Sequence, residues 1–281
     1  MKKETKEREF RFTDHDFQSI QAMVGRHTGI KLSEAKRDMV YSRLSRRLRA
    51  LKITNFKDYC EMLEEDTGEE LVQFTNAITT NLTSFFRENH HFEYLRNTLL
   101  PDLIIRNSSS RRIRIWSAGC STGEEPYSLA MTIKESVPNA DAWDIKILAT
   151  DLDSNVLASA REGTYALERI EGIDERRRRR WFLKNKNNGS GVTRVIPELQ
   201  KMITFKQLNL MHEWPMKGPF DIIFCRNVVI YFDKPTQKIL FGRYADLMGK
   251  DGHLFVGHSE TLYRVSDNFD LIGSTIYKMR N

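Results

Sequence analysis

The stretch RIWSAGCSTGEEPYSLA, residues 114–130, decides the fold of this chain. It reads as a strand, a tight turn containing Gly119 and Gly123, and the start of a helix, an order typical of sheets that bind ligands beyond their strand ends. Glycines in such a turn let a ligand approach the backbone closely. The carboxylate of Glu124 would repel a pyrophosphate but attract an ammonium or sulfonium group, so the stretch favours a cationic ligand. The turn taken alone also fits a purely structural role.

The sequence after residue 110 alternates strand-like and helical stretches. This alternation predicts an α/β sheet with mostly parallel strands and right-handed crossovers. Residues 164–204 interrupt the alternation, and we interpret them as a small inserted subdomain with a hairpin at residues 187–191. The last two strand-like runs would add an antiparallel pair at one edge. The runs are RIRIWSA (112–118), DIKILATD (144–151), MITFKQLNL (202–210), FDIIFCRNV (220–228), HLFVGHS (253–259) and STIYKM (274–279).

The first 80 residues show helical periodicity without a strand pattern, beginning with a capping box between Thr13 and Asp16. We therefore predict a helical domain over residues 1–80, a linker helix over 81–110 and an α/β domain over 111–281. Residues 1–60 hold 15 Lys and Arg against 8 Asp and Glu, which gives +7, while the whole chain is +6. This basic excess indicates an acidic partner at the N-terminal end, with solubility alone as the alternative.

The composition argues against several classes of protein. Three cysteines, Cys60, Cys120 and Cys225, form no CxxC pair, which disfavours a zinc site or a disulfide scaffold and favours reduced thiols. No run of about 18 apolar residues occurs, and the first residues lack the apolar core of a signal peptide. We therefore expect a cytoplasmic protein without a bound metal and without direct membrane insertion.

Asp151 ends the strand-like run that follows the glycine turn. An acid at such a strand end can accept two hydrogen bonds from a ribose diol. S-adenosylmethionine (SAM) combines that diol with an ammonium and a sulfonium group, so it suits both Glu124 and Asp151. The alternative for Asp151 is a cap of the helix that follows, and this alternative is compatible with the binding role.

Long motifs, which occur in the family's order along the chain, resemble the chemotaxis receptor methyltransferases of the CheR family. The resemblance extends from the basic N-terminal helix nearly to the end of the chain. The family's own pattern fits the turn, although the generic methyltransferase turn has an acid and three alternating glycines where this chain has Ser117, Cys120 and Ser121. The motifs are TTNLTSFFRE (79–88), WSAGCSTGEEPYSLA (116–130), ATDLD (149–153), PFDIIFCRNVVIYFD (219–233) and GHSETL (257–262).

The resemblance implies a doubly wound, mostly parallel sheet of the SAM-dependent methyltransferase type, with an inserted β-subdomain and an all-α N-terminal domain. It implies a protein-glutamate O-methyltransferase that acts on the cytoplasmic domain of chemotaxis receptors and leaves S-adenosylhomocysteine (SAH). In some members the inserted subdomain docks a receptor's C-terminal peptide. The alternatives are a methyltransferase of another protein or of a small acid, and a non-catalytic module that binds receptors or nucleic acid.

The resemblance also implies roles for individual residues. The linker motif would contact the methionine end of the cofactor and the reaction centre. Glu124 would contact the ammonium group, and Asp151 would bind the ribose. Two residues after the third strand would flank the adenine. Asn81 and Asn227 also fit ordinary caps or turns, and Arg87 also fits a surface ion pair with Glu88 or Glu93. The residues expected to bind the cofactor are Asn81, Thr83, Arg87, Glu124, Asp151, Asn209, Leu210, Asn227 and Val228.

A glutamate side chain, with a pKa of about 4.3, is already an anion at neutral pH. Methyl transfer to it therefore needs positioning and partial desolvation rather than a general base. We expect Arg87 and Tyr231 to orient the substrate carboxylate, because the planar guanidinium of arginine holds a carboxylate in fixed geometry. The three nearby histidines are expected to pack rather than to act as bases; they are His90, His91 and His258.

The second predicted helix has a basic side opposite an apolar arc. An acidic receptor helix would match this side, whereas the absence of aromatic residues within it disfavours nucleic acid. A solvated basic face is the alternative, and it is also our interpretation of the run Arg176–Arg180. The apolar arc holds Val40, Leu44, Leu48 and Leu51. The basic side holds Lys36, Arg43, Arg46, Arg47 and Arg49, and the four arginines are the expected substrate-binding residues.

Overall fold

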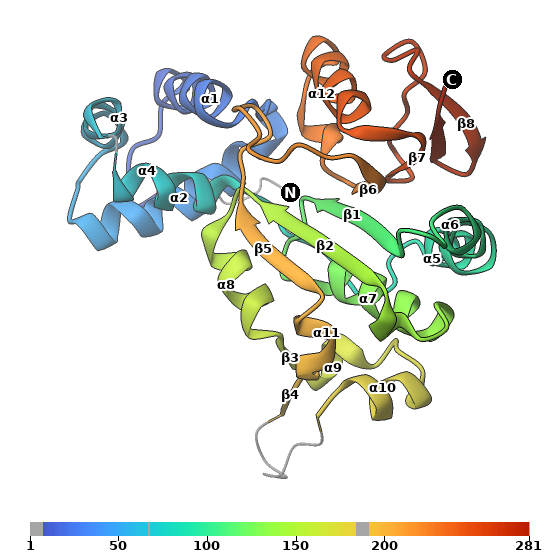
Figure 1. Cartoon of the computed structure of the whole chain (residues 1–281). Coiled ribbons are helices and arrows are strands. Elements are labelled where there is room, and N and C mark those ends of the chain that lie inside the picture. Colours follow the sequence, from blue (N-terminus) through green and yellow to red (C-terminus); the bar gives the residue numbers. More distant parts are fainter. Residues whose placement is uncertain (1–7, 67, 184–190, 281) are drawn as a thin grey trace, which may run out of the picture. The chain divides into compact units, whose positions relative to one another are not determined.

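A computed structural model describes residues 8–66, 68–183 and 191–280 (Figure 1). The chain divides into two compact units, Met1–Thr80 and Asn81–Asn281. The segment 81–110 belongs to the second unit. The prediction of a helix over this segment is wrong for residues 81–89, because the first helix there begins at His90. No helix among the described residues is both long enough and apolar enough to cross a lipid bilayer.

The described part of the first unit is all helical, as the periodicity predicts. The capping box is confirmed, because the Thr13 side chain accepts from the Asp16 amide while the Asp16 carboxylate accepts from the Thr13 amide. Helix packing buries an aromatic and aliphatic core that includes Phe17 and Phe74. The elements are α1 (Asp14–Thr28), η1 (Glu34–Lys36), α2 (Arg37–Leu51), α3 (Phe56–Glu65) and α4 (Glu69–Ile78).

The second unit is built on a seven-stranded sheet in the order β5-β2-β1-β6-β7-β9-β8. Neighbouring strands from β5 to β7 are parallel, while β9 runs antiparallel to both β7 and β8. The predicted α/β sheet with an antiparallel edge is therefore confirmed. The strands are β1 (Arg112–Ala118), β2 (Asp144–Asp151), β5 (Ile203–Gln207), β6 (Phe220–Cys225), β7 (Met248–Val256), β8 (Phe269–Gly273) and β9 (Ile276–Met279).

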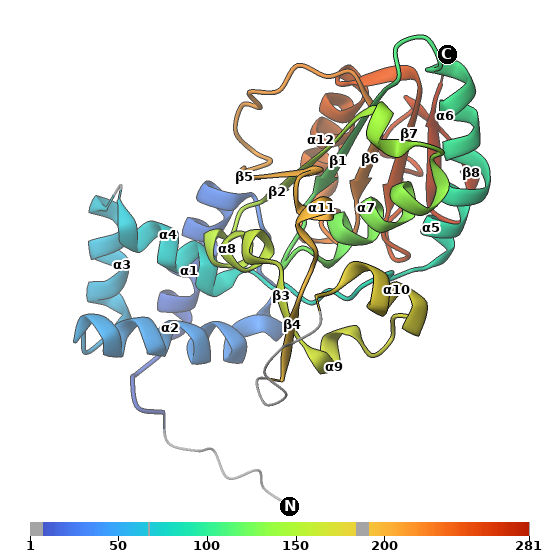
Figure 2. The same cartoon turned by 60° about the horizontal axis from the view of Figure 1, so that its bottom comes forward.

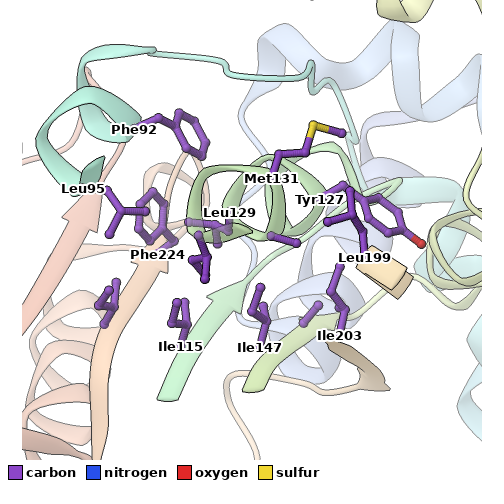
Figure 3. Close-up of a cluster of buried hydrophobic side chains, with 14 of the residues drawn as sticks. Phe92, Leu95, Ile115, Tyr127, Leu129, Met131, Ile147, Leu199, Ile203 and Phe224 are labelled. Carbon is purple, nitrogen blue, oxygen red and sulfur yellow. The ribbon is translucent and has the colours of Figure 1, made fainter. Parts of the chain in front are cut away.

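Helices cover both faces of this sheet, so the fold is doubly wound. On one face, Ile115, Ile147, Ile203 and Phe224 extend from neighbouring strands towards the helix that carries Leu129 (Figure 3). On the other face, Trp116 packs against Tyr244 of α12 with ring centroids 5.2 Å apart. The helices are α5 (His90–Tyr94), η2 (Leu95–Leu99), α6 (Leu100–Arg106), α7 (Glu124–Ser136), η3 (Ala140–Ala142), α8 (Ser154–Glu162), η4 (Val229–Tyr231) and α12 (Lys234–Asp246).

The strand order reverses at β1, which locates the site. From β1 the chain proceeds to β2 and β5 on one side, and it returns to β6 and β7 on the other. In open α/β sheets the crevice at such a reversal, beyond the carboxyl ends of the strands, holds the ligand. The glycine turn that follows β1 lies at this point.

The described part of the insertion between α8 and β5 contains a two-stranded antiparallel sheet and three short helices, which can be followed in Figure 2. Most of the predicted hairpin turn, residues 187–190, lies outside the described residues. The solvated-face interpretation of Arg176–Arg180 is wrong for Arg177, because its Nη2 lies 2.7 Å from Glu135 Oε2 and its guanidinium lies 4.4 Å from the Phe86 ring centroid. The elements are β3 (Thr164–Ala166), α9 (Leu167–Ile170), α10 (Glu175–Trp181), β4 (Val192–Arg194) and α11 (Pro197–Gln200).

Candidate cofactor and active site

The glycine turn joins β1 to α7 and packs tightly against the residues that follow β6. Gly119 and Gly123 have φ angles of 96° and 98°, a region that favours glycine. A Cβ atom at Gly119 would lie 2.3 Å from Val228 Cγ2, so the turn and the residues after β6 are in direct contact. The glycines therefore have a structural role, and their packing brings Val228 to the end of β1.

Glu124 is the first residue of α7, and its side chain is fully buried. The Thr122 hydroxyl donates to Glu124 Oε2 at 2.7 Å, while Arg169 from α9 donates to Glu124 Oε1. Sequence reasoning missed Arg169, because it lies 45 positions from Glu124 in the inserted subdomain and belongs to no motif used above. The positive charge of Arg169, in the inserted subdomain, thus balances the negative charge of the Glu124 carboxylate.

Asp151 lies at the carboxyl end of β2 and binds the glycine turn. Its Oδ2 accepts from the Ser121 amide at 2.8 Å, and its Oδ1 accepts from the Asp153 amide at 3.0 Å. Burial raises the pKa of Asp151 to about 6, although these backbone hydrogen bonds oppose the rise. Each carboxylate oxygen has a further lone pair, so the group can still accept from two hydroxyls. The helix-cap alternative is wrong for Asp151, because Asp153 caps α8.

Asn81 connects the start of the second unit to the turns after β1 and β2. Its side-chain amide donates to Asp153 Oδ2 at 2.8 Å, and its carbonyl accepts from the Ser121 hydroxyl at 2.9 Å. Thr83, two residues further on, is partly exposed. The linker motif therefore lies beside Asp151, although some 70 positions separate the two in sequence.

Arg87 lies in a strained part of the same linker. Phe86 and Glu88 on either side have φ angles of 52° and 55°, values that cost non-glycine residues about 1–3 kcal/mol each. The Phe86 amide donates to the Ser128 hydroxyl at 3.0 Å, and Arg226 donates to the Arg87 carbonyl. The Arg87 guanidinium donates to the Leu82 carbonyl at 2.8 Å and forms no ion pair with the described acidic residues. The surface ion-pair alternative is therefore wrong.

A buried ion network holds this loop against the sheet. The Arg226 side chain is 2% exposed, and its Nη1 lies 3.0 Å from Glu125 Oε2 while its Nη2 lies 3.1 Å from Glu88 Oε2. Burial would raise the pKa of Glu88, but a hydrogen bond from His258 and the charge of Arg226 outweigh it and lower the pKa to about 2. Sequence reasoning missed Arg226, although an arginine inside the apolar run FDIIFCRNV was a visible signal.

Asn227 and Val228 lie in the segment just after β6 and Arg226. The Asn227 amide donates to Glu260 Oε2 at 2.8 Å, and the residue has a φ angle of 59°. A Cβ atom at Gly257 would lie 2.4 Å from Asn227 Nδ2, so the ends of β6 and β7 also meet here. Tyr231 lies in η4 shortly afterwards and is partly buried.

Asn209 and Leu210 belong to the loop that follows β5. The preceding residue, Leu208, donates its amide to the Asp151 carbonyl at 2.9 Å, which joins this loop to the end of β2. Arg243 donates to the Leu210 carbonyl at 2.7 Å, and its guanidinium lies 3.9 Å from the Trp214 ring centroid. The expected cofactor residues therefore come from loops at the carboxyl ends of β5, β2, β1 and β6 and from the linker.

The basic side of α2 is not one free surface. The Arg43 guanidinium donates to the Ala77 carbonyl at 3.1 Å, and Arg47 binds Glu70, whose Oε1 lies 3.0 Å from Arg47 Nε. The expectation that the basic side of α2 forms one exposed face is therefore wrong for Arg43 and Arg47, because both side chains bind residues of α4. Arg49 is exposed and pairs with Glu9 at 3.1 Å.

Arg46 is exposed and has no side-chain partner among the described residues. Val40, Leu44 and Leu48 are buried as predicted, but Leu51 is 37% exposed. Leu51 is the last residue of α2.

Comparison with known proteins covers almost the whole chain. Residues 15–79 match the CheR methyltransferase all-alpha domain, and residues 81–278 match the CheR methyltransferase SAM binding domain. A probable chemotaxis protein methyltransferase of Rhizobium etli is 45% identical over 91% of this chain and 96% of its own length. Chemotaxis protein methyltransferase 2 of Pseudomonas aeruginosa is 46% identical over 96% of this chain and 94% of its own.

The chemotaxis protein methyltransferase of Escherichia coli is 42% identical over 95% of this chain and 91% of its own length. The two family models and these relatives agree with the motifs and with the geometry at the strand ends. The chain therefore belongs to the CheR methyltransferase family, and its second unit is the SAM binding domain of that family.

Proposed function

We propose that this protein transfers a methyl group from SAM to glutamate side chains of chemotaxis receptors. The observation that carries the proposal is the pair of carboxylates, Glu124 and Asp151, that the turn after β1 holds together. Thr122 binds one of them and Ser121 binds the other. Two carboxylates suit an ammonium and a ribose diol, and they disfavour a phosphate ligand.

The residues at the strand ends fit SAM by their chemistry. Glu124 would bind the ammonium and Asp151 the ribose hydroxyls, while Asn209 and Leu210 would flank the adenine. The methionine end would lie among the remaining residues of the set. Those residues are Asn81, Thr83, Arg87, Asn227 and Val228. When bound, SAM supplies an electrophilic methyl group on its sulfonium.

The chain's own contribution to the chemistry is orientation. The substrate glutamate is already ionised at neutral pH, so no residue needs to remove a proton. Arg87 would hold one oxygen of that carboxylate, and the strained backbone around it fixes the side chain before substrate arrives. Tyr231 would help to orient the same group.

The nearby histidines do not suggest a base. Burial lowers the pKa of His91 to about 3, so it is neutral, and its Nε2 lies 3.0 Å from Thr275 Oγ1. His258 Nδ1 lies 2.9 Å from Glu88 Oε1. These contacts support packing and positioning roles, in keeping with a reaction that needs no general base.

The relatives are named chemotaxis protein methyltransferases, which supports receptors as the substrate class. The reaction would then take place in the cytoplasm, on the receptor's cytoplasmic helices. Arg46 and Arg49 are exposed on α2 and would attract acidic residues on such a helix. In addition, the inserted subdomain would dock a receptor C-terminal peptide.

Incubation with methyl-labelled SAM and purified receptor cytoplasmic fragments tests this function. We expect label on the fragment and none on a matched fragment whose candidate glutamates are replaced by glutamine. An unrelated acidic helical protein serves as the control for charge alone. Equal labelling of all three proteins, or labelling of a small acid instead, would contradict the proposed substrate class.

A further inference from the structure

The inserted subdomain contacts the two phenylalanines that precede Arg87 in the linker. The Phe85 ring packs edge-on against Tyr165 of β3, with ring centroids 5.0 Å apart. The guanidinium of Arg177, from α10, lies over the Phe86 ring, with its Cζ 4.4 Å from the ring centroid. The subdomain therefore holds the linker directly beside the residue that is proposed to orient the substrate carboxylate.

Glu135 of α7 fixes the Arg177 side chain. Arg177 Nη2 lies 2.7 Å from Glu135 Oε2, and Arg177 Nε lies 3.0 Å from the same oxygen. Trp181 Nε1 donates to Glu135 Oε1 at 2.8 Å, so the carboxylate is held as well. The side chains of Arg177 and Glu135 are 21% and 16% exposed, and solvent screens such a partly buried pair weakly. The guanidinium therefore keeps its place over the Phe86 ring.

The Phe86 backbone has an unusual conformation that the surrounding contacts must hold. Its φ angle is 52°, in the left-handed region that a bulky residue rarely adopts. The Phe86 amide donates to the Ser128 hydroxyl at 3.0 Å, and the ring packs edge-on against Phe92 with centroids 5.3 Å apart. Because Arg87 is the next residue, a relaxation of the Phe86 backbone would change the direction of the Arg87 side chain.

We propose that Arg177 is a positioning residue, which acts through Phe86 to hold Arg87 in the orientation that methyl transfer requires. The inference rests on the proposed role of Arg87 in orienting the substrate carboxylate. A guanidinium attracts the face of an aromatic ring, and two hydrogen bonds to one carboxylate fix the guanidinium plane. The inserted subdomain then serves the methyl transfer step itself, in addition to the proposed docking of a receptor peptide.

A simpler role for Arg177 is to stabilise the fold through its ion pair with Glu135. The two roles differ in how substitutions at Arg177 and Arg87 combine. A residue that only stabilises the fold lowers turnover by the same factor whether or not the Arg87 guanidinium is present. A residue that positions Arg87 has little effect once that guanidinium has been removed, because nothing is left to be positioned.

Turnover on receptor cytoplasmic fragments is compared in four proteins: the wild type, Arg177→Gln, Arg87→Ala and the double variant. Arg177→Gln alone should lower kcat about three- to thirtyfold, the range for a partly buried cation–π contact that is felt in the transition state. In the Arg87→Ala background it should lower kcat less than about twofold. The KM for the fragments, and the SAH affinity measured by calorimetry, should change less than about threefold, because Arg177 contacts neither ligand in this account.

Two further variants complete the design. Arg179→Gln is the matched control, because Arg179 lies on the same helix, is 74% exposed and pairs with Glu175 one turn earlier. It should have the kcat, KM and SAH affinity of the wild type. Arg177→Lys keeps a positive charge beside Glu135 without the planar guanidinium, so it should fold and lose part of kcat. If Arg177→Gln does not fold, Arg177→Lys replaces it in both backgrounds.

An equal fold-loss of kcat in both backgrounds would overturn the proposal and leave Arg177 with a structural role. A rise in KM at unchanged kcat would also overturn it, because Arg177 would then serve receptor docking. Wild-type turnover in Arg87→Ala would remove the residue that Arg177 is proposed to position, with the same consequence. Fragments that the wild type does not methylate at all would contradict the proposed function itself, and the inference would fall with it.

Discussion

Arg226 and Glu88 form a buried ion pair, with Nη2 3.1 Å from Oε2, although 138 positions separate them in the sequence. Arg226 follows β6 directly, and Glu88 belongs to the linker loop. Because Arg226 also donates to the Arg87 carbonyl, the pair fixes the backbone on both sides of the Arg87 side chain. The orientation of Arg87 thus depends on a charge outside the linker.

Arg226→Gln should destabilise the second unit by about 3–5 kcal/mol, because it leaves the buried carboxylates of Glu88 and Glu125 without a partner. The four tryptophans of the chain, residues 116, 143, 181 and 214, all lie in the second unit. Urea unfolding followed by tryptophan fluorescence therefore reports on that unit alone. Among the molecules that remain folded, turnover should fall more than SAH affinity.

Arg114→Gln is the control for this variant. Arg114 pairs with Asp144, whose side chain is 50% exposed, at the opposite end of the sheet from the site. A pair that solvent screens contributes about 0–1 kcal/mol, so the loss should be small and turnover unchanged. Similar losses of stability and turnover in both variants would show that Arg226 does not hold the linker specifically.

The sequence predicted the elements of the site better than their contacts. The glycine turn, Asp151 and the linker motif could be located because each follows from local backbone requirements or from a continuous motif. Arg169, Arg226 and Arg243 could not, because their roles arise from pairing across 30 to 140 positions with residues that only the folded sheet brings near. The helical wheel likewise predicted the buried side of α2, but it could not show that Arg43 and Arg47 hold α4.

Asp151→Ala should weaken SAH binding about ten- to hundredfold, because the ribose diol loses an ionised acceptor. The pKa of Asp151 is about 6, so the acceptor is ionised above that pH. The wild-type affinity should therefore be steady above pH 7 and fall as the pH drops through 6, while the variant lacks this step. Calorimetry across pH 5 to 8 measures both effects.

The matched control for Asp151 is Asp144→Ala at the other end of the same strand. It should bind SAH with wild-type affinity and the wild-type pH profile. If Asp151→Ala kept full affinity, or if both variants lost it equally, Asp151 would not be the ribose ligand.

Arg87→Ala should lower turnover about ten- to hundredfold while changing SAH affinity by a smaller factor. The reason is that a charged hydrogen bond of about 1.5–3 kcal/mol would be lost mainly when the substrate carboxylate is oriented. Steady-state kinetics on receptor fragments, with calorimetry on SAH, measures the two effects separately. Wild-type turnover in this variant would remove Arg87 from the reaction.

Charge reversal on α2 should separate recognition from folding. Arg46→Glu should raise the KM for receptor fragments, because Arg46 is exposed, and added salt should weaken the wild type more than the variant. Arg47→Glu should instead lower the stability of the first unit, because Arg47 forms an ion pair with Glu70 that the new carboxylate would repel. Circular dichroism melting and kinetics at two salt concentrations distinguish these outcomes. A solvated-face role predicts an unchanged KM for Arg46→Glu at both salt concentrations.

The most direct test of the account is to identify the atom that receives the methyl group. Receptor fragments methylated by the protein would be digested, and the modified residue mapped by mass spectrometry before and after mild alkali. The account predicts a methyl ester on glutamate that alkali removes, and no modification with Asp151→Ala at limiting SAM. An alkali-stable methyl group on lysine, arginine or the backbone would contradict it.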